Sequence, residues 1–272
     1  MVNITGDPLF QSAVLPLFVS VAALLVLRRF GWYWGGLAVV LGFYAAVYLI
    51  RGFDFFPLRS TNKIVLSGLA AVALGLLFDA LAIKRHLKPL LFVLAAAVVV
   101  WLIWPRFKRL DGWELYLTVL GCGFYGGWLA VLSVSLQSRT VRADSAVMAL
   151  SLGTGFSALL AATALYGQLA LAIAAAVGGK WLLTLLGRGG VSGLSMLLPM
   201  LLLCALLGVG AVVYAKLPWY NLALFASIPL LAQIALPLWP RWLEAMVVTA
   251  LCLLPASIAI YLTWQAAGGL PY

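Results

Sequence analysis

Charged residues are scarce in this sequence, and their scarcity is the first feature that narrows its class. Only 9% of the 272 residues are Asp, Glu, Lys or Arg, whereas a soluble domain carries about 25%. Hydrophobic residues make up 65% of the chain, and the mean hydropathy is +1.14. A water-soluble chain would have to be far larger to bury this much apolar surface. The composition therefore excludes an ordinary soluble domain and favours a lipid bilayer as the solvent.

Histidine and cysteine are too few for the usual metal and haem sites. His86 is the single histidine and lies in a basic turn, where it is expected to be solvated. Cys122, Cys204 and Cys252 fall inside apolar runs without CxxC spacing, as small buried apolar residues do. The chain also lacks a GxxxxGK[ST] loop, an HExxH motif and an acidic cluster for prenyl diphosphates. We therefore expect no metal, no cofactor and no ATP hydrolysis through a phosphate loop.

What the sequence does contain is a series of continuous apolar runs, such as Leu90–Trp104. A β-barrel strand alternates apolar and polar residues over about ten positions, and these runs do not alternate. Each is close to the roughly 20 residues of a spanning helix, which satisfies its own backbone groups in hydrocarbon. We predict an all-α, polytopic integral membrane protein without a soluble domain. The ten predicted transmembrane helices cover residues 10–28, 32–50, 63–83, 88–105, 113–136, 144–166, 168–187, 194–215, 218–238 and 242–264.

Most basic residues lie in the short breaks between these runs, at membrane-surface positions. The net charge of +10 therefore indicates acidic headgroups rather than nucleic acid as the partner. With the N-terminus outside, nine basic residues face the cytoplasm and seven face outward. This difference barely satisfies the positive-inside rule, so the orientation stays open. We expect membrane lipids as partners, no nucleic acid, and a location in the bacterial cytoplasmic (inner) membrane.

Short matches between the two halves of the chain suggest an internal repeat. The strongest relates Trp104-Pro105-Arg106 to Trp239-Pro240-Arg241, because these residues are rarer here than Ala and Leu. The others relate 11–14 to 144–147, 23–25 to 158–160, and 35–38 to 167–170, so all offsets lie between 132 and 135 residues. Chance within a biased composition is the alternative. A real repeat would divide the chain into five-helix units at 1–140 and 141–272, the second inserted upside down.

This layout resembles the drug/metabolite transporter superfamily: ten short helices arranged five plus five, with almost no extramembrane domain. The resemblance covers the layout of the whole chain and includes no diagnostic motif. It implies a permease in which two inverted halves meet around a site near the midplane. Bile-acid/sodium symporters share the count, but their broken fourth helix does not match the run that continues here through Val100.

Lys180 is the clearest ionisable residue inside a predicted span. A charge in the bilayer costs about 3 kcal/mol on insertion scales, so it indicates a functional site. Lys180 would either neutralise an anionic substrate or pair with a carboxylate. The alternative is that its long stem snorkels to the headgroups, roughly 10 Å away.

Other polar residues give weaker signals. Gln233 needs a hydrogen-bond partner in lipid and is expected to face another helix, and Tyr44 and Tyr48 are candidates for lining a cavity. With Lys180 they form the predicted substrate-binding set. Asp144 is interpreted as a helix N-cap before Ser145. Glu114 and Glu244 open the fifth and tenth spans, where the helix dipole favours acidic residues, and Asp79 lies near the end of the third.

Four glycines are predicted to serve helix packing: Gly123 and Gly127, which form a GxxxG pair, and Gly178 and Gly179 beside Lys180. Small residues at this spacing let two backbones approach closely. Such contacts either hold a static interface or allow helices to slide during transport.

Three functions stay open at this stage. The leading one is a small secondary transporter that moves a small polar or anionic solute by alternating access, supported by the span count, the repeat, Lys180 and Gln233. The second is a non-catalytic integral subunit of a larger membrane complex, supported by the scarcity of intramembrane charge. Protein partners are expected either in such a complex or in a homodimer, and an isolated monomer or homodimer would favour the transporter. The third is a lipid-modifying membrane enzyme, which would need polar groups that converge at one bilayer depth. If the protein is a transporter, as in the leading hypothesis, we expect it to have no catalytic residues and not to be an enzyme.

Overall fold

The structure is a computed structural model that describes residues 7–30, 34–53, 56–81, 86–109, 112–187, 191–235 and 240–268. Within these ranges the regular elements are helices and none is a strand, so the all-α prediction is confirmed. The elements are η2 (Phe10–Val14), α1 (Leu15–Leu27), α2 (Gly35–Arg51), α3 (Ser60–Leu81), α4 (Leu87–Ile103), η4 (Trp104–Arg109), α5 (Gly112–Leu136), α6 (Thr140–Leu160), α7 (Ala164–Leu185), α8 (Leu194–Tyr214), α9 (Tyr220–Leu231) and α10 (Arg241–Ala266).

Eight helices in the described part of the chain are long and apolar enough to cross a membrane. α2 and α9 are also apolar but have only 17 and 12 residues. These eight helices are consistent with a polytopic membrane protein. The prediction of ten spanning helices stays a prediction. The ninth predicted span, 218–238, corresponds to a helix that ends at Leu231. Trp239, which supplied part of the strongest repeat match, lies outside the described residues.

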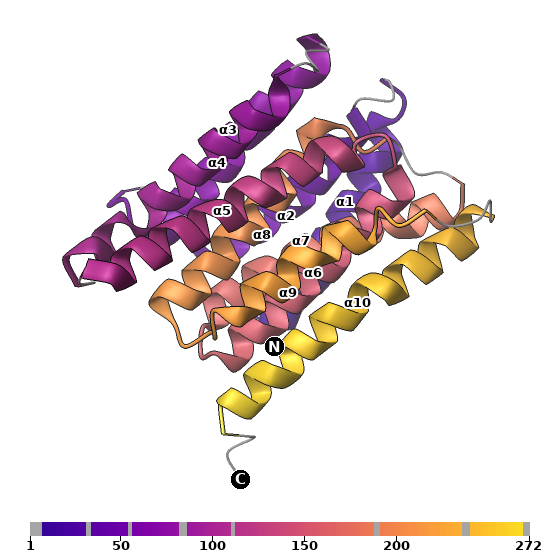
Figure 1. The fold of residues 1–272 in the computed structure, drawn as a ribbon. Coiled ribbons are helices and arrows are strands. Elements are labelled where there is room, and N and C mark those ends of the chain that lie inside the picture. Colours follow the sequence, from indigo (N-terminus) through magenta and orange to yellow (C-terminus); the bar gives the residue numbers. More distant parts are fainter. Residues whose placement is uncertain are drawn as a thin grey trace.

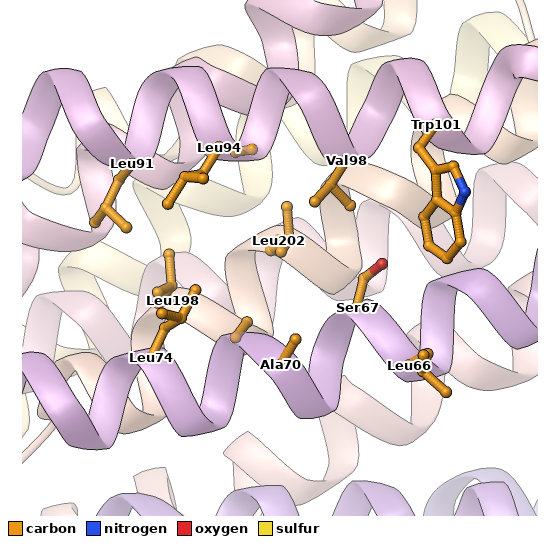
Figure 2. Close-up of a pocket in the computed structure, with 12 residues that line it drawn as sticks. Leu66, Ser67, Ala70, Leu74, Leu91, Leu94, Val98, Trp101, Leu198 and Leu202 are labelled. Atoms are coloured by element: carbon orange, nitrogen blue, oxygen red, sulfur yellow. The ribbon is translucent and has the colours of Figure 1, made fainter.

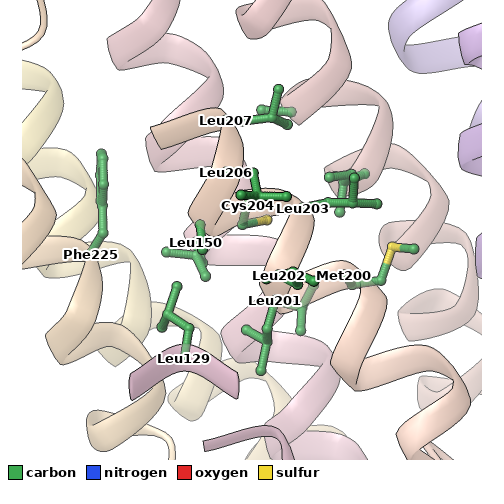
Figure 3. Packing of buried hydrophobic residues seen from close by; sticks show 14 of the residues in the cluster. Leu129, Leu150, Met200, Leu201, Leu202, Leu203, Cys204, Leu206, Leu207 and Phe225 are labelled. Carbon is green, nitrogen blue, oxygen red and sulfur yellow. The ribbon is translucent and has the colours of Figure 1, made fainter. Parts of the chain in front are cut away.

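α8 is the central helix of the bundle, with α3 and α4 toward one edge and α10 at the opposite edge (Figure 1). Nearly nine-tenths of α8 is buried inside the protein, and a continuous leucine-rich run from Leu197 to Leu207 is enclosed by its neighbours. Figure 3 shows Leu129 of α5, Leu150 of α6 and Phe225 of α9 around this helix. The most hydrophobic spanning helix is thus shielded from lipid by the others.

α6 and α7 form an antiparallel hairpin closed by a tight turn. Ala162 adopts a left-handed conformation, with φ of 64°. The backbone N–H of Thr163 donates to Ala158 O at 3.0 Å, and that of Ala162 donates to Leu159 O at 3.2 Å. This is the Schellman pattern, which satisfies the last carbonyl groups of a helix. The turn fixes the register of the two helices, so residues equally far from Ala162 lie at the same level.

The helix contacts differ between the two halves of the chain. α6 packs extensively along α10, whereas α1 and α5, which would correspond to them in a 5+5 repeat, form no comparable contact between their described residues. α3 packs mainly along α8 and α4 along α5, while α3 and α4 touch each other at few points. The inverted repeat of 1–140 and 141–272 stays a prediction.

Candidate functional site

A fully buried ion pair joins the two helices of the α6–α7 hairpin. Lys180 Nζ of α7 lies 2.7 Å from both carboxylate oxygens of Asp144 in α6. Both side chains are completely inaccessible. An isolated charge in such surroundings costs several kcal/mol, and the pair is tolerated only where hydrogen bonds satisfy both partners. The site therefore depends on the groups around it.

Ser192, which precedes α8, completes the ion pair. Its hydroxyl accepts a hydrogen bond from Lys180 Nζ at 2.5 Å and donates to Asp144 Oδ1 at 2.8 Å. Thr184, one turn after Lys180, lies 3.4 Å from Asp144 Oδ2 through its hydroxyl oxygen. We call Asp144, Lys180, Thr184 and Ser192 the ion-pair cluster. It ties α6, α7 and the start of α8 together at one end of the bundle, which we call the ion-pair end.

The ion-pair cluster shows that the interpretation of Asp144 as an N-cap is wrong. It also decides between snorkelling and pairing for Lys180. Asp144 is not an N-cap, because α6 begins at Thr140 and Asp144 lies in its second turn. Lys180 does not snorkel, because its ammonium group is enclosed by protein. Of the roles considered for Lys180, pairing with a carboxylate is the one observed.

The Asp144–Lys180 pair was missed, although the sequence contains a signal for it once the turn is placed at Ala162 rather than at residue 167, between the predicted spans 144–166 and 168–187. Asp144 lies 18 residues before Ala162 and Lys180 lies 18 residues after it. In an antiparallel hairpin this equal spacing places both residues at one level. A lysine in hydrocarbon requires a counter-charge, and Asp144 is the acidic residue at that level of the adjoining helix. Ser192 carried no such signal, because it approaches from a different part of the chain.

A second carboxylate, Asp79 near the end of α3, holds the start of α8 from the other side. Asp79 Oδ1 accepts from the backbone N–H of Leu194 at 3.0 Å, and Oδ2 accepts from that of Ser195 at 2.9 Å. These N–H groups have no partner within the helix, and the helix dipole favours an anion there. A side chain at Gly193 would meet Asp79 Oδ2 at 2.5 Å. Glycine at 193 therefore permits the close approach.

A further pair lies closer to the surface at the same end. Arg142 of α6 donates through Nε to Glu244 Oε1 of α10 at 2.6 Å. It also donates to the Ile234 carbonyl at 2.8 Å, and Arg139 donates to the Gln233 carbonyl at the same distance. These arginines satisfy backbone acceptors that follow α9. Glu244 and Glu114 lie in the first turns of α10 and α5, as predicted.

Polar side chains continue along α6 away from the ion-pair cluster. Asp144, Ser151 and Thr154 lie within roughly 80° around the helix axis, at 100° per residue, and Ser157 lies about 60° further round the axis than Thr154. All four are fully buried. The Ser151 hydroxyl donates to Val147 O at 2.7 Å, whereas the hydroxyls of Thr154 and Ser157 have no hydrogen-bond partner among the described residues. We call these four residues the α6 polar track.

The other predicted substrate-binding residues do not gather around Lys180. Tyr44 is buried in α2, and its hydroxyl donates to Val65 O of α3 at 3.0 Å. Tyr48 is 60% exposed and its ring lies beside that of Phe53. Gln233 follows the end of α9, and its amide donates to Pro229 O of the preceding turn at 3.2 Å rather than to another helix. Among the described residues, no hydrogen bond joins any two of Lys180, Gln233, Tyr44 and Tyr48.

The predicted packing glycines lie at three helix contacts: α5 with α4, α7 with α1, and α7 with α6. In α5, a side chain at Gly127 would meet the Phe92 ring of α4 at 2.7 Å, while Gly123 has ordinary spacing, 3.8 Å from Ala96. In α7, a side chain at Gly179 would meet Leu17 O of α1 at 2.9 Å. Gly178 again has ordinary spacing, 3.8 Å from Met148. One glycine of each pair therefore sets a close approach.

Comparison with known proteins does not assign the chain to a family. No protein-family model and no curated protein sequence matches the chain. The function is therefore inferred from the residues of the bundle itself.

Proposed function

We propose that this protein is a small secondary transporter of the bacterial cytoplasmic membrane, which moves a small polar or anionic solute by alternating access. In this proposal the ion-pair cluster closes the pathway at the ion-pair end, and the α6 polar track lines the part that leads into the membrane. The observation that carries the proposal is the fully buried Asp144–Lys180 pair in a helical membrane bundle.

The position of the pair supports a role beyond stability. A buried ion pair often contributes no more stability than apolar residues of the same volume. Ionisable residues within spanning segments usually face a bundle interior or a solute pathway. Here the pair and Ser192 join three separate chain segments, so that its opening would free the start of α8 from the α6–α7 hairpin.

The α6 polar track supports a pathway that continues from this closure. Buried hydroxyl groups without partners are costly, and such groups call for a ligand or water. Thr154 and Ser157 are two such groups on one helix, beyond the ion pair. A solute carboxylate or phosphate would replace Asp144 as the partner of Lys180, and Asp144 would take up a proton or be hydrated in the opened pathway, so that neither buried charge is left uncompensated while the solute passes.

Single-cysteine variants test alternating access. Starting from a chain in which Cys122, Cys204 and Cys252 are replaced by alanine, cysteine is introduced as Ser192→Cys or as Ser157→Cys. We expect membrane-impermeant thiol reagents to label position 192 from one side of the membrane and position 157 from the other. The matched control keeps only native Cys204, which is fully buried in α8 and should stay unlabelled. A static protein would leave all three unlabelled.

Uptake into proteoliposomes tests the role of the ion pair directly. The double variant Asp144→Leu with Lys180→Met removes both charges, so no uncompensated charge remains to unfold the protein. We expect the wild type to take up one member of a panel of radiolabelled carboxylates and inorganic phosphate. The double variant should be folded but at least tenfold slower. Equal uptake by both proteins would remove the ion pair from the mechanism.

One observation favours the alternative of a non-catalytic integral subunit. The ion-pair cluster, the Asp79 contacts and the tight Gly127–Phe92 contact all fix helices to one another, as a scaffold requires. Purification in a gentle detergent separates the two functions. A defined set of co-purifying proteins, together with unlabelled positions 157 and 192, would support the subunit.

A further inference from the structure

An apolar groove runs along the bundle between α3 and α4, away from the ion-pair cluster. Its volume is about 190 Å³, and Leu198 and Leu202 of α8 form its floor (Figure 2). The groove exists because α3 packs on α8 and α4 packs on α5, so the two helices diverge from each other. Its walls reach from Leu66 to Leu74 on α3 and from Leu91 to Trp101 on α4.

The length of this α3–α4 groove matches one leaflet of a bilayer. At 1.5 Å per residue the lined segments extend about 12–15 Å. A hydrocarbon core is about 30 Å thick, so one leaflet occupies about half of it. Ser67 is the single side chain with a hydroxyl along the lining, and that hydroxyl already donates to Lys63 O at 2.7 Å. The interior of the groove therefore suits a hydrocarbon chain and offers nothing to a polar solute.

Lys63, whose exposed fraction is only 9%, places a cation beside Trp101 at one end of the groove. Lys63 Nζ lies 4.8 Å from the centre of the Trp101 ring and donates to Trp101 O at 2.8 Å. An ammonium group has three N–H donors, and this contact uses one. No carboxylate lies within ion-pair distance of Lys63 in the described part of the chain, where the ion pairs are Arg142–Glu244 and Lys180–Asp144.

Further basic residues belong to the same end of the bundle. Arg59 precedes α3 and is exposed, and Arg106 follows α4, with its guanidinium 5.6 Å from the centre of the Tyr214 ring. Arg59 and Arg106 thus add positive charge at the end of the groove where Lys63 lies. An acyl chain in the groove would reach the headgroup region at this end. Basic residues at membrane surfaces attract anionic lipids by about 1 kcal/mol each.

We propose that the α3–α4 groove binds one acyl chain of an anionic phospholipid, whose phosphate contacts Lys63. The length of the groove selects a lipid chain, and the ammonium group at its end selects a negative headgroup. A transmembrane helix of another protein would leave Lys63 without an anion, and so it fits the same surface less well. This site is separate from the transport proposal, because it contains no residue of α6 or α7.

Native mass spectrometry of the full chain in a mild detergent tests the proposal. Phosphatidylglycerol and phosphatidylcholine with identical acyl chains are the probes. We expect one phosphatidylglycerol to bind about fivefold more tightly than phosphatidylcholine, the factor that corresponds to one charge contact. In Lys63→Gln this preference should disappear, because phosphatidylglycerol binding should weaken more than phosphatidylcholine binding, whose phosphate is already neutralised by choline. In Ala70→Phe, which fills the groove, both lipids should bind more weakly.

Two matched controls keep the test specific. Lys216→Gln removes an exposed cation after α8, outside the groove, and Ala97→Phe adds the same ring to an exposed position of α4 that does not line it. Both should bind lipid as the wild type does, and thermal unfolding of each variant checks its fold. Equal binding of the two lipids by the wild type would overturn the proposal. A loss in Lys216→Gln equal to that in Lys63→Gln would also overturn it, as would a co-purifying polypeptide that Ala70→Phe displaces.

Discussion

Two carboxylates hold the start of α8, and they do so by different means. Asp79 of α3 accepts hydrogen bonds from two backbone N–H groups, is partly exposed and has no basic partner among the described side chains. Asp144 of α6 binds a lysine and a serine and is completely enclosed. Asp79 thus completes a helix terminus, whereas Asp144 completes a charge pair.

This difference separates a structural role from a candidate functional one. A helix N-terminus supplies N–H groups that any nearby acceptor, including water, can satisfy. Water does not replace the partner of a buried ammonium group, which requires an anion beside it. The two sites should therefore respond very differently to the loss of a single group, and four substitutions measure that contrast.

The largest effect is expected from Lys180→Met, which breaks the ion pair and leaves Asp144 buried without a counter-charge. We expect a loss of about 3–5 kcal/mol in the free energy of unfolding, measured by chemical denaturation in one fixed detergent. The double variant with Asp144→Leu should regain most of this stability. If the double variant is as unstable as Lys180→Met, uncompensated charge is not the cause.

A smaller effect is expected from Ser192→Ala, which keeps both charges but removes the hydroxyl between them. Hydrogen bonds to charged groups contribute about 1.5–3 kcal/mol, so we expect a loss of about 2 kcal/mol in the same assay. Ser192→Thr retains the hydroxyl and is the control. Equal stability of the alanine variant and the wild type would show that Ser192 does not support the pair.

Asp79→Ala should cost about 1 kcal/mol, the usual effect of removing a helix N-terminal acceptor. Water can reach the freed N–H groups of Leu194 and Ser195, because Asp79 is partly exposed. Asp79→Asn retains one acceptor and should lie between the wild type and the alanine variant. A loss from Asp79→Ala as large as that from Lys180→Met would contradict the distinction between the two carboxylates.

The smallest effect is expected from Arg142→Gln, at the partly exposed pair with Glu244. Surface ion pairs contribute about 0–1 kcal/mol, although this arginine also donates to Ile234 O. We expect a change below about 1 kcal/mol that shrinks further as salt is added, measured by denaturation at low and high salt. A large, salt-independent loss in the free energy of unfolding would show that the Arg142–Glu244 pair behaves like the buried Asp144–Lys180 pair.

The fold class could be predicted from the sequence, and the candidate site only in part. Continuous runs such as Leu90–Trp104 indicate helices in lipid, because hydrocarbon leaves the backbone few alternatives. Lys180 stood out because a charge in such a run is costly. Asp144 was misassigned, because the predicted span began at residue 144, whereas α6 begins at Thr140.

The sequence by itself determined the solvent, the helical class and the presence of one costly lysine, since all three follow from hydropathy along the chain. Tertiary structure decided which groups meet: Asp144 with Lys180, Ser192 between them, and Asp79 at the start of α8. It also decided that Tyr44 and Tyr48 lie apart from that cluster. Hydropathy acts along one segment at a time, whereas these contacts join residues up to 116 positions apart and depend on how helices pack.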